Sequence, residues 1–406
     1  MAYKFIEGSV TAAKGFQASG IHCGMRKNKS KKDLALIFCE KKCTAAAVYT
    51  KNLVQSSPIT VTKKNLSDGY AQAVICNSGN ANTCNADGME KAEMMCKLTA
   101  DKLGIAAEDV IVGSTGVIGQ ILPIEPIANG MDQLVSELSV NGGTNAAEAI
   151  MTTDTVSKEV AVETKIDGKI VKIGGISKGS GMIHPNMATM LCFVTTDAAI
   201  SSEMIQKAVK TAADKTFNMI SIDGDTSTND TLSVMASGLA GNTEITEENE
   251  AYYIFLDALT AVCKELSRKM AKDGEGATKL LICKVSGAKS ESDAKGVAKS
   301  VICSSLLKAA MFGSDANWGR ILCAIGYSGC DVDVNKVDVS FASKAGKIGV
   351  CKNGAGVEFS EEIAKAILTE DEIDIIIELN DGNGSAEAYG CDLTYEYVKI
   401  NGDYRT

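Results

Sequence analysis

The sequence predicts an α+β fold, a sandwich of sheets and helices in layers. Short apolar runs with turn residues between them are typical of strands, and longer runs with helical spacing stand among them. Asp167-Gly168, the strongest short-range hairpin signal, separates two strand-like runs. Strands joined by hairpins and mixed with helices favour a layered sandwich over a doubly wound parallel sheet. At 406 residues the chain is expected to form two subdomains or one large layered unit.

The first third of the chain predicts three strands followed by a helix. The strands are expected at 33–39, 45–50 and 71–76, where short apolar runs are bounded by turn residues. Asp87 is a candidate N-cap with Glu90 placed to complete a capping box, and apolar residues then recur at helical spacing as far as Gly104. We therefore expect an amphipathic helix there.

The middle and end of the chain alternate between the two kinds of element. Strands are expected at 159–166 and 169–176 on either side of the Asp167-Gly168 turn. Further helices are expected at 202–215, 247–272 and 294–311, and a further strand at 279–286. The runs 372–379 and 393–400 bracket a loop of Asn, Gly and Ser, which predicts an antiparallel pair of strands.

Composition and charge exclude several classes of partner. Hydrophobic residues make up 45% and charged residues 23% of the chain, and no stretch has the apolar length of a membrane span. The net charge of −10 argues against a nucleic-acid or anionic-membrane partner. An anionic substrate must then be held by a few local cations. The beginning, MAYKFIEGSV, lacks an apolar signal region, so we expect a cytoplasmic protein.

The cysteines are expected to be buried, reduced thiols. There are 14, scattered mostly inside apolar runs and never arranged as C-x-x-C. Cys39 and Cys43 are close in sequence but have no histidine nearby, which makes a zinc site improbable. No metal is expected.

Thr189 is the candidate nucleophile. It opens an apolar run directly after KGSGMIHPNMA, in which Gly179 and Gly181 permit unusual backbone conformations and Pro185 fixes the approach. On residue type alone, a threonine that hydrogen-bonds a neighbouring backbone group is the commoner case. In a strained loop, however, its hydroxyl can attack the Ala188 carbonyl, and hydrolysis of the resulting ester frees the Thr189 amine. That amine, with a pKa of about 7.7–8.0, suits the role of base for its own hydroxyl.

Acyl transfer also needs donors for the oxyanion, and IVGSTGVIG at 111–119 offers a strand leading into a glycine-rich turn. Thr115 and Gly116 are the candidates there, and one such donor is worth on the order of 3 kcal/mol. The glycine spacing by itself also fits an ordinary tight turn, and it matches neither a Walker loop nor a complete dinucleotide fingerprint.

Other polar residues have a functional and an ordinary interpretation. Lys178 could neutralise an anionic substrate or be a solvated loop lysine. His184 is one of only two histidines, and a residue that shapes the turn is favoured over a catalytic base. The segment DGDTSTND at 223–230 departs from a calcium loop and predicts a polar turn that braces a site. In DGEG at 273–276, Gly274 could end the preceding helix and leave Glu275 exposed.

Taken together, seven motifs closely resemble the ornithine acetyltransferase family, also called glutamate N-acetyltransferase. The resemblance extends over essentially the whole chain in order. The most specific motifs are KGSGMIHPNMATML and NWGRI. The full set is NSGNANTC (77–84), VGSTGVIG (112–119), MTTDT (151–155), KGSGMIHPNMATML (178–191), DGDTSTND (223–230), FGSDANWGRIL (312–322) and the ending YVKINGDYRT.

The resemblance implies a self-cleaving acetyltransferase of arginine biosynthesis. The chain would be cut between Ala188 and Thr189 into an α chain, 1–188, and a β chain, 189–406, which stay together, typically as an α2β2 heterotetramer. The implied fold is similar to that of amino-terminal nucleophile hydrolases but with a distinct topology. Thr189 would take the acetyl group from N-acetylornithine and pass it to glutamate.

The same resemblance implies the remaining site residues. Thr115 and Gly116 match the oxyanion hole, and the positions that match substrate contacts are Thr152, Lys178, Thr189, Glu275, Asn401 and Thr406. A substrate that carries both a positive and a negative charge suits a site that contains Lys178 and Glu275. A role for Asn401 and Thr406 requires that the C-terminal residues be docked, which the strand expected at 393–400 would achieve.

Two alternatives stay open from the sequence. The first is an amidase or aminopeptidase with an amino-terminal nucleophile, in which water replaces glutamate as the acceptor. The second is a non-catalytic binding or assembly protein whose glycine-rich loops are merely turns. No cofactor is expected, and the sequence does not settle whether acetyl-CoA serves as a co-substrate.

Overall fold

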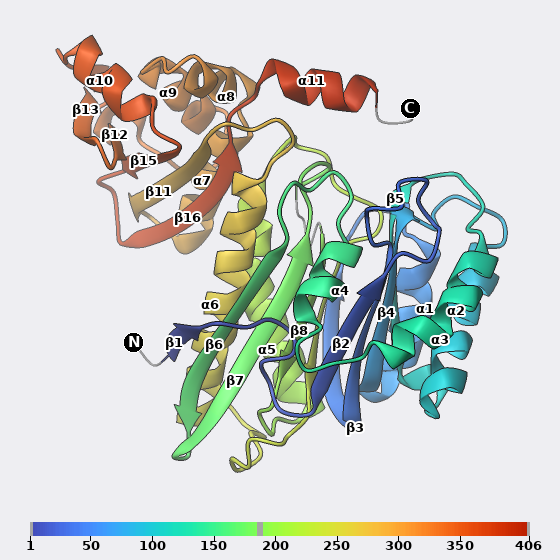
Figure 1. Cartoon of the computed structure of the whole chain (residues 1–406). Helices are drawn as coiled ribbons and strands as arrows, with labels where there is room; N and C mark the ends of the chain where they lie inside the picture. The colour runs from blue at the N-terminus through green and yellow to red at the C-terminus, as the bar shows by residue number, and fades with distance from the viewer. Residues whose placement is uncertain (1–2, 185–189, 404–406) are drawn as a thin grey trace. The chain divides into compact units, whose positions relative to one another are not determined.

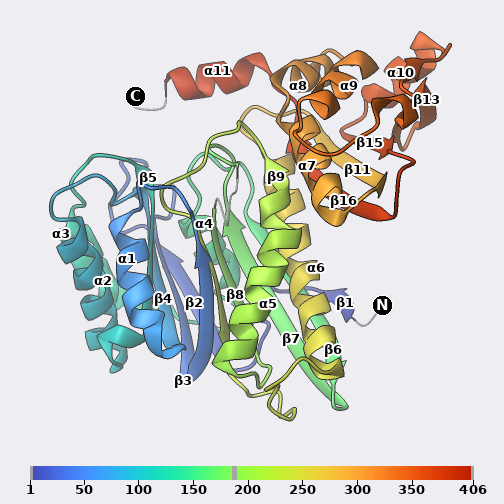
Figure 2. The same ribbon diagram turned by 180° about the vertical axis from the view of Figure 1, so that it is seen from behind.

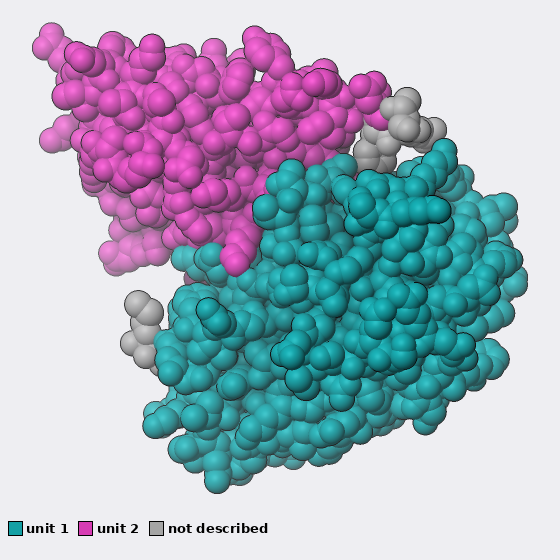
Figure 3. Space-filling model, in the orientation of Figure 1, with its two compact units in different colours: residues 1–179, 185–218, 226–266 teal, residues 180–184, 219–225, 267–406 magenta. Residues whose placement is uncertain are grey.

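The structure is a computed structural model that describes residues 3–184 and 190–403; Figure 1 and, from behind, Figure 2 draw its ribbon. The chain forms two compact units, coloured separately in Figure 3. Among the described residues the first unit comprises 3–179, 190–218 and 226–266, and the second comprises 180–184, 219–225 and 267–403. The predicted cut between 188 and 189 lies outside the described residues, so the division into α and β chains stays a prediction.

The first unit is built on one extensively hydrogen-bonded set of strands. Among the described residues its order is β1-β6-β7-β8-β10-β3-β4-β5, with β2 also paired to β3. The strands are β1 Tyr3–Ile6, β2 Phe16–Ile21, β3 Leu34–Tyr49, β4 Tyr70–Asn80, β5 Val110–Val117, β6 Lys158–Ile166, β7 Lys169–Lys178, β8 Leu191–Thr196 and β10 Thr231–Ala236.

Strand β3 connects the two halves of this set. Its residues 34–39 pair with β2, residues 34–38 and 43–44 pair with β4, and residues 44–49 pair with β10. The pairing with β4 is irregular between Phe38 and Cys43. This irregular stretch overlaps the gap that the sequence predicts between two separate strands. The expected strands at 33–39 and 45–50 are therefore the two ends of one long strand.

Alternate residues of β4 and β5 enter two different cores, as the period-two geometry of a strand requires. Cys76 and Ile111 join the core that contains Leu191 and Phe193 of β8. The intervening residues, Ala73, Ile75, Val110 and Val112, join the core that contains residues of α2 and α3. Strands β4 and β5 are therefore covered by strands on one face and by helices on the other.

Helices of the first unit cover the outer faces of these strands (Figure 2), except Gly143–Ala149 (α4), whose alanines join the inner core with Leu191 and Phe193. Helix α5 contacts β3 and β10, while α6 places Val262 and Leu266 against Gly175 of β7. The layered α+β sandwich is thus confirmed. The helices are α1 Ser57–Asn65, α2 Gly88–Leu103, α3 Ile124–Ser136, α4 Gly143–Ala149, α5 Ser202–Lys215 and α6 Glu250–Lys272, whose residues from 267 on belong to the second unit.

The hairpin between β6 and β7 confirms the prediction from Asp167-Gly168. The two turn residues have φ of 50° and 73°, as a type I′ turn needs. The ladder runs without a break from Ile166↔Lys169 to Lys158↔Ser177. This register carries the chain to Lys178, the last residue of β7.

The second unit has its own mixed sheet, in the order β14-β13-β12-β15-β11-β16-β9 among the described residues. Its strands are β9 Ile220–Ser221, β11 Leu280–Ala288, β12 Asp338–Ser343, β13 Gly346–Lys352, β14 Ala355–Gly356, β15 Glu372–Glu378 and β16 Gly384–Cys391. Its helices are α7 Glu291–Cys303, α8 Ser305–Phe312, α9 Trp318–Gly326, α10 Glu361–Leu368 and α11 Tyr395–Gly402. Short 3₁₀ helices in the chain are Leu66–Asp68, Ala107–Asp109, Phe217–Met219 and Val334–Lys336.

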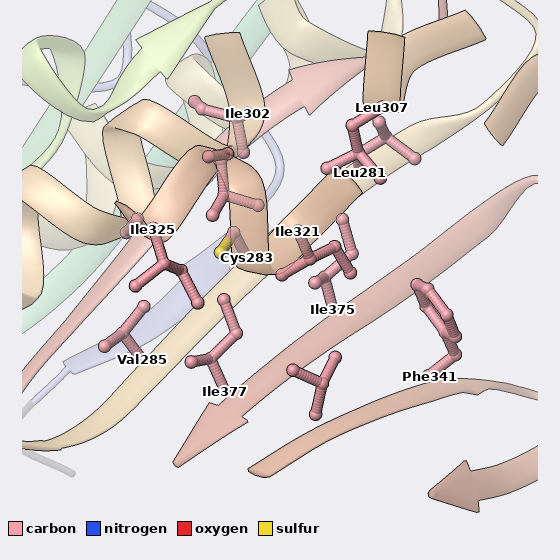
Figure 4. Packing of buried hydrophobic residues seen from close by; sticks show 14 of the residues in the cluster. Leu281, Cys283, Val285, Ile302, Leu307, Ile321, Ile325, Phe341, Ile375 and Ile377 are labelled. Carbon is pink, nitrogen blue, oxygen red and sulfur yellow. The ribbon is translucent and has the colours of Figure 1, made fainter. Parts of the chain in front are cut away.

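The core of the second unit lies between this sheet and its helices. Figure 4 shows Cys283 of β11 and Ile375 and Ile377 of β15 packed with Ile302 of α7 and Ile321 of α9. In β15 buried and half-buried residues alternate, with Ile373, Ile375 and Ile377 inside. The strand predicted at 372–379 is therefore confirmed.

Two predicted elements of the second unit are wrong. The helix expected at 294–311 is divided into α7 and α8 at Ser304, whose backbone leaves the helical region (φ −68°, ψ 107°) and whose hydroxyl accepts a hydrogen bond from Leu307 N at 3.3 Å. The strand expected at 393–400 is helix α11, with Tyr395 83% and Val398 68% exposed. The second strand is instead β16, and it pairs with β11 rather than with β15.

Helix α2 occurs where the sequence predicts it, but without the expected cap. Asp87 is at the N-cap position and makes no capping hydrogen bond. Its carboxylate accepts a hydrogen bond from Asn85 Nδ2 at 3.1 Å and pairs with Lys91 at 3.8 Å instead. Gly104 ends the helix with a φ of 69°, as expected.

Candidate active site

The first group of candidate residues lies where strands of the first unit end. Lys178 ends β7 opposite Leu191, the first residue of β8, and Thr115 is near the end of β5. The Lys178 ammonium donates a hydrogen bond to Thr115 Oγ1 at 3.4 Å. Both residues are buried, with exposed fractions of 8% and 9%, so Lys178 is not the solvated loop lysine that the sequence also allowed.

Gly116 follows Thr115 in a conformation that excludes other residues. Its φ is 135°, and a Cβ added there would lie 2.3 Å from the carbonyl carbon of Gly79 in β4. The β4–β5 pairing becomes irregular immediately after Gly79↔Gly116. The predicted glycine-rich turn is thus the distorted end of a strand, and the two backbones approach closely there.

Asp154 joins two of the candidate substrate contacts. Its Oδ2 accepts a hydrogen bond from Thr152 N at 2.9 Å, and its Oδ1 accepts one from Gly179 N at 2.7 Å, next to Lys178. Oδ1 also accepts a hydrogen bond from the Lys158 ammonium at 2.7 Å, and both side chains of this ion pair are fully buried. Burial alone would raise the pKa of Asp154, but the charges of Lys178 and Lys158 hold it below its usual value.

A buried amide network braces the same strand ends. Asn229 Nδ2 donates hydrogen bonds to Ser114 O at 2.8 Å and to Ala81 O at 2.6 Å, and Thr83 Oγ1 donates one to Asn229 Oδ1 at 2.9 Å. Ser114 Oγ in turn donates to Asn77 Oδ1 at 2.6 Å. Part of the predicted polar turn at 223–230 therefore does brace the ends of β4 and β5.

Asp230, the last residue of that turn, is a buried carboxyl. Burial raises its pKa well above the usual value, against the opposing effects of a hydrogen bond from Ser227 and the charge of Lys178. Its Oδ2 has no hydrogen-bond partner among the described residues. Asp230 immediately precedes β10.

The predicted nucleophile and cleavage site, Thr189 and Ala188, lie outside the described residues. The chain is described again from Met190, a buried residue whose carbonyl accepts a hydrogen bond from Thr231 N at 2.8 Å. Leu191 then pairs with Lys178 on one side and with Thr231 on the other. Strand β8, which follows Thr189, is thus hydrogen-bonded along both edges.

The second group lies in the second unit. Glu275 is only 8% exposed, its N–H donates to Ser180 O at 2.8 Å, and its Oε2 accepts a hydrogen bond from Asn401 Nδ2 at 2.8 Å. Gly181 lies against this carboxyl, since a Cβ there would be 2.3 Å from Oε2. The interpretation of Glu275 as an exposed helix-end residue is wrong. Asn401 lies on helix α11 rather than after a strand, and Thr406 lies outside the described residues.

His184 is held in the second unit just before the undescribed segment. Its Nδ1 lies 3.1 Å from Ser221 Oγ and 3.4 Å from Cys303 Sγ. Burial, assisted by the charge of Lys299, lowers the pKa of His184 to about 4. Asp223 accepts hydrogen bonds from Met182 N at 2.6 Å and Ile183 N at 2.9 Å, so the start of the polar turn anchors this segment.

The sequence reasoning missed Asp154 and Asp230. Asp154 stands in the MTTDT motif with Lys158 four positions later, and that spacing of opposite charges was a usable signal. For Asp230 nothing in the sequence distinguishes a buried carboxyl from the exposed ones of a polar turn.

No three His, Cys, Asp or Glu side chains gather as a metal site would require within 3–184 and 190–403. In the same part of the chain, none of the helices has the length and apolar character needed to cross a bilayer. The cysteines are free.

A family model described as the ArgJ family matches residues 17–406. The chain is 50% identical over 404 residues to the arginine biosynthesis bifunctional protein ArgJ of Caldanaerobacter subterraneus subsp. tengcongensis, covering 99% of this chain and 100% of that protein. It is 48% identical over 406 residues to the protein of the same name from Halalkalibacterium halodurans, covering 99% and 97% of the two chains.

Solved structures give related matches. A crystal structure of the arginine biosynthesis bifunctional protein argJ from Bacillus halodurans matches with a TM-score of 0.50 and 48% identity, covering 52% of this chain and 97% of that chain. A structure of ornithine acetyltransferase complexed with ornithine from Mycobacterium tuberculosis matches with a TM-score of 0.43 and 36% identity, covering 46% of this chain and all of that one.

Proposed function

The chain belongs to the ArgJ family, and from that premise we propose that it moves an acetyl group from N2-acetyl-L-ornithine to L-glutamate by a ping-pong mechanism. The family places the chain among the acyltransferases of arginine biosynthesis. In the proposed mechanism Thr189 carries the acetyl group between the two amino acids as an ester.

The observation that carries this proposal is the pairing of Lys178 with Thr115 at the strand ends beside β8. The buried Lys178 ammonium lies 3.4 Å from the Thr115 hydroxyl. Lys178 pairs with Leu191, which follows Thr189 by only two positions in the chain. The distorted strand end at Gly116 lies next to Thr115. A fixed cation and fixed donors of this kind stabilise the negative charge that develops on a carbonyl oxygen during acyl transfer.

The same residue would first cut the chain. The Thr189 hydroxyl attacks the Ala188 carbonyl, the C–N bond breaks, and the nitrogen takes the hydroxyl proton. Water then hydrolyses the ester, which leaves a carboxylate on Ala188 and an amine on Thr189. The argJ crystal structure from Bacillus halodurans supports a two-chain product, because its chain is covered to 97% and yet matches only 52% of this one.

In the transfer reaction, the Thr189 amine takes the proton of its own hydroxyl as that oxygen attacks the acetyl carbonyl. The C–N bond of N-acetylornithine breaks, and ornithine leaves with the proton. The glutamate amine then attacks the acetyl ester and regenerates the free hydroxyl. Thr115 and Gly116 would hold the oxyanion in both half-reactions.

The charges of the candidate residues match the charged groups of the substrates. Lys178 would attract a carboxylate, while Glu275, held by Asn401, would attract the side-chain ammonium of ornithine. Thr152, whose backbone is fixed by Asp154, and Thr406 complete the proposed contacts. Transfer by this route needs no cofactor.

We further propose that acetyl-CoA can supply the acetyl group, so that the chain also makes N-acetylglutamate directly. The relatives that match the whole chain are called bifunctional, which supports this second activity. An α2β2 assembly is the proposed quaternary structure of the cleaved chains.

The test compares the wild-type chain with Thr189→Ala and Thr189→Ser. The wild type should give two fragments, one beginning at Thr189, and should convert N-acetylornithine plus glutamate to N-acetylglutamate. Thr189→Ala should stay uncut and inactive, whereas Thr189→Ser should still be cut.

Two results would reject the proposal. Cleavage of Thr189→Ala would exclude self-cleavage by the threonine hydroxyl. Release of acetate with no N-acetylglutamate would show that water is the acceptor, which identifies an amidase.

A further inference from the structure

The loop at residues 22–33, between β2 and β3, concentrates positive charge in an acidic protein. We call it the basic loop. The net charge of the whole chain is −10, yet five cationic side chains fall within seven consecutive positions of this loop. They are Arg26, Lys27, Lys29, Lys31 and Lys32. A charge averaged over the whole chain hides this cluster, so the argument from net charge against polyanionic ligands does not apply to it.

The basic loop has a defined conformation. Asp33, fully buried, accepts hydrogen bonds from Cys23 N at 2.7 Å and Arg26 N at 3.0 Å. The Asn28 side chain accepts hydrogen bonds from Ser30 N at 3.0 Å and from Ser30 Oγ at 2.7 Å. These bonds close the loop at its base and at its tip, so its lysines are carried on an ordered backbone.

Three of the five cations have no partner within residues 3–184 and 190–403. Lys32 pairs with Glu148 at 2.7 Å, and Arg26 donates to the carbonyl of Met151. The side chains of Lys27, Lys29 and Lys31 make no ion pair or hydrogen bond among the described residues. Like charges at alternate positions of one short loop repel one another, so an anion that binds among them lowers the electrostatic free energy of the protein.

The base of the loop is next to the candidate active site. The Arg26 side chain reaches the carbonyl of Met151, the residue before Thr152. Its Cγ also lies 3.2 Å from where a Cβ of Gly79 would be, and Gly79 pairs with Gly116. Figure 1 shows the loop, in dark blue, leaving β2 beside the end of β5. A ligand bound to the loop therefore has a short path to Thr115 and Gly116.

We propose that the basic loop binds the phosphate groups of the acyl donor acetyl-CoA. The inference rests on the proposed second activity and deepens it by assigning a site to the donor. Acetyl-CoA carries its phosphates far from its thioester, on a flexible arm, so a cationic loop beside the site matches that distribution of charge. N-acetylornithine has no phosphate, and its use does not depend on the loop.

The test removes the three unpartnered charges as Lys27→Gln, Lys29→Gln and Lys31→Gln together. The matched control removes three lysines on β13 and α10 of the second unit whose side chains likewise make no ion pair or hydrogen bond in the described part of the chain, as Lys347→Gln, Lys352→Gln and Lys365→Gln. Both variants lose the same charge, so any effect of net charge is common to them.

The loop variant should have a KM for acetyl-CoA raised roughly tenfold or more at low salt, with kcat nearly unchanged. Its transfer from N-acetylornithine to glutamate should match the wild type. Adenosine 3′,5′-bisphosphate should compete with acetyl-CoA in the wild type and in the control, and only weakly in the loop variant. Added NaCl should reduce the difference between the variants.

Several results would overturn the proposal. Equal KM values for acetyl-CoA in the two variants would do so. So would a loop variant in which transfer from N-acetylornithine falls as much as transfer from acetyl-CoA. If an oligonucleotide binds the wild type more tightly than CoA does, the loop is a nucleic-acid site instead.

The test also separates this proposal from the second activity. If the wild type does not use acetyl-CoA, CoA binding is measured by calorimetry. Binding that is at least tenfold weaker in the loop variant supports the loop site even though the proposed activity is absent. No binding to the wild type contradicts both.

Discussion

Asp154→Asn tests the buried ion pair that supports the candidate site. In the folded chain the Asp154 carboxylate accepts hydrogen bonds from Lys158 Nζ and from Gly179 N, both at 2.7 Å, and from Thr152 N at 2.9 Å. The asparagine keeps the shape but removes the charge, and its amide nitrogen cannot accept any of these bonds. Lys158 then remains as a fully buried cation without its counter-charge.

The expected loss of stability is about 3–5 kcal/mol, which is the usual cost of removing one partner of a buried ion pair. A matched control is Asp101→Asn, because Asp101 pairs with Lys97 at 2.6 Å with the same spacing, but with side chains 58% and 63% exposed. Removal of that pair should cost under about 1 kcal/mol. The double variant Asp154→Asn with Lys158→Met should be more stable than Asp154→Asn alone, because the buried charge of Lys158 is removed together with its counter-charge.

The assay is urea unfolding followed by far-UV circular dichroism, repeated at several pH values. Since the pKa of Asp154 is held below its usual value in the folded chain, its contribution is present above about pH 4 and is lost as the pH falls through the folded-state pKa. The difference between wild type and Asp154→Asn should therefore shrink on acidification. A loss below about 1 kcal/mol, or a loss that does not change with pH, would refute the reasoning.

Three further predictions follow from the second unit. Gly356→Ala should shift the fluorescence of the single tryptophan and cost about 1–3 kcal/mol, because its Cβ would lie 2.5 Å from the Trp318 ring; an unchanged spectrum would contradict this. Burial lowers the pKa of Lys299 to about 8 from 10.5, so between these values the unfolded chain binds more protons at this group, and the stability of the wild type relative to Lys299→Met should rise with pH. Urea titrations of both proteins at pH 8 and 10 check this, and a difference in stability that is the same at the two pH values would contradict it. Glu275→Gln and Asn401→Ala should each raise the KM for N-acetylornithine, roughly tenfold for Glu275→Gln, with a smaller change in kcat; steady-state assays that find only kcat altered would exclude a role in binding.

Local patterns in the sequence were sufficient for most of the fold. The Asp167-Gly168 hairpin was correct because a type I′ turn depends on its own two residues. Helix α5 begins and ends where its apolar spacing predicts. The prediction of a strand at 393–400 was wrong because the aromatic and β-branched residues of this segment suit a strand. Helix α11 buries none of its residues, so the segment has no apolar face whose spacing could have indicated a helix.

The candidate site was less predictable, because its contacts join residues far apart in the chain. The bond between Lys178 and Thr115 depends on how the strand ends of β7 and β5 are brought together, and no local spacing encodes that. The interpretation of Glu275 as exposed was wrong for the same reason, since its burial comes from Ser180, Gly181 and Asn401. Thr189 and Thr406 lie outside the described residues and stay predictions.

The strand order of the first unit has a consequence for the product of a cut at Thr189. Strands β8 and β10 come after that bond, whereas their outer neighbours β7 and β3 come before it. Severing the backbone would leave two polypeptides interleaved in one ladder, so that neither could dissociate without breaking the ladders on both outer edges. Each half expressed alone would lack the strands that the other half supplies. Co-expression of the two halves should therefore reconstitute the set of strands that neither half forms by itself.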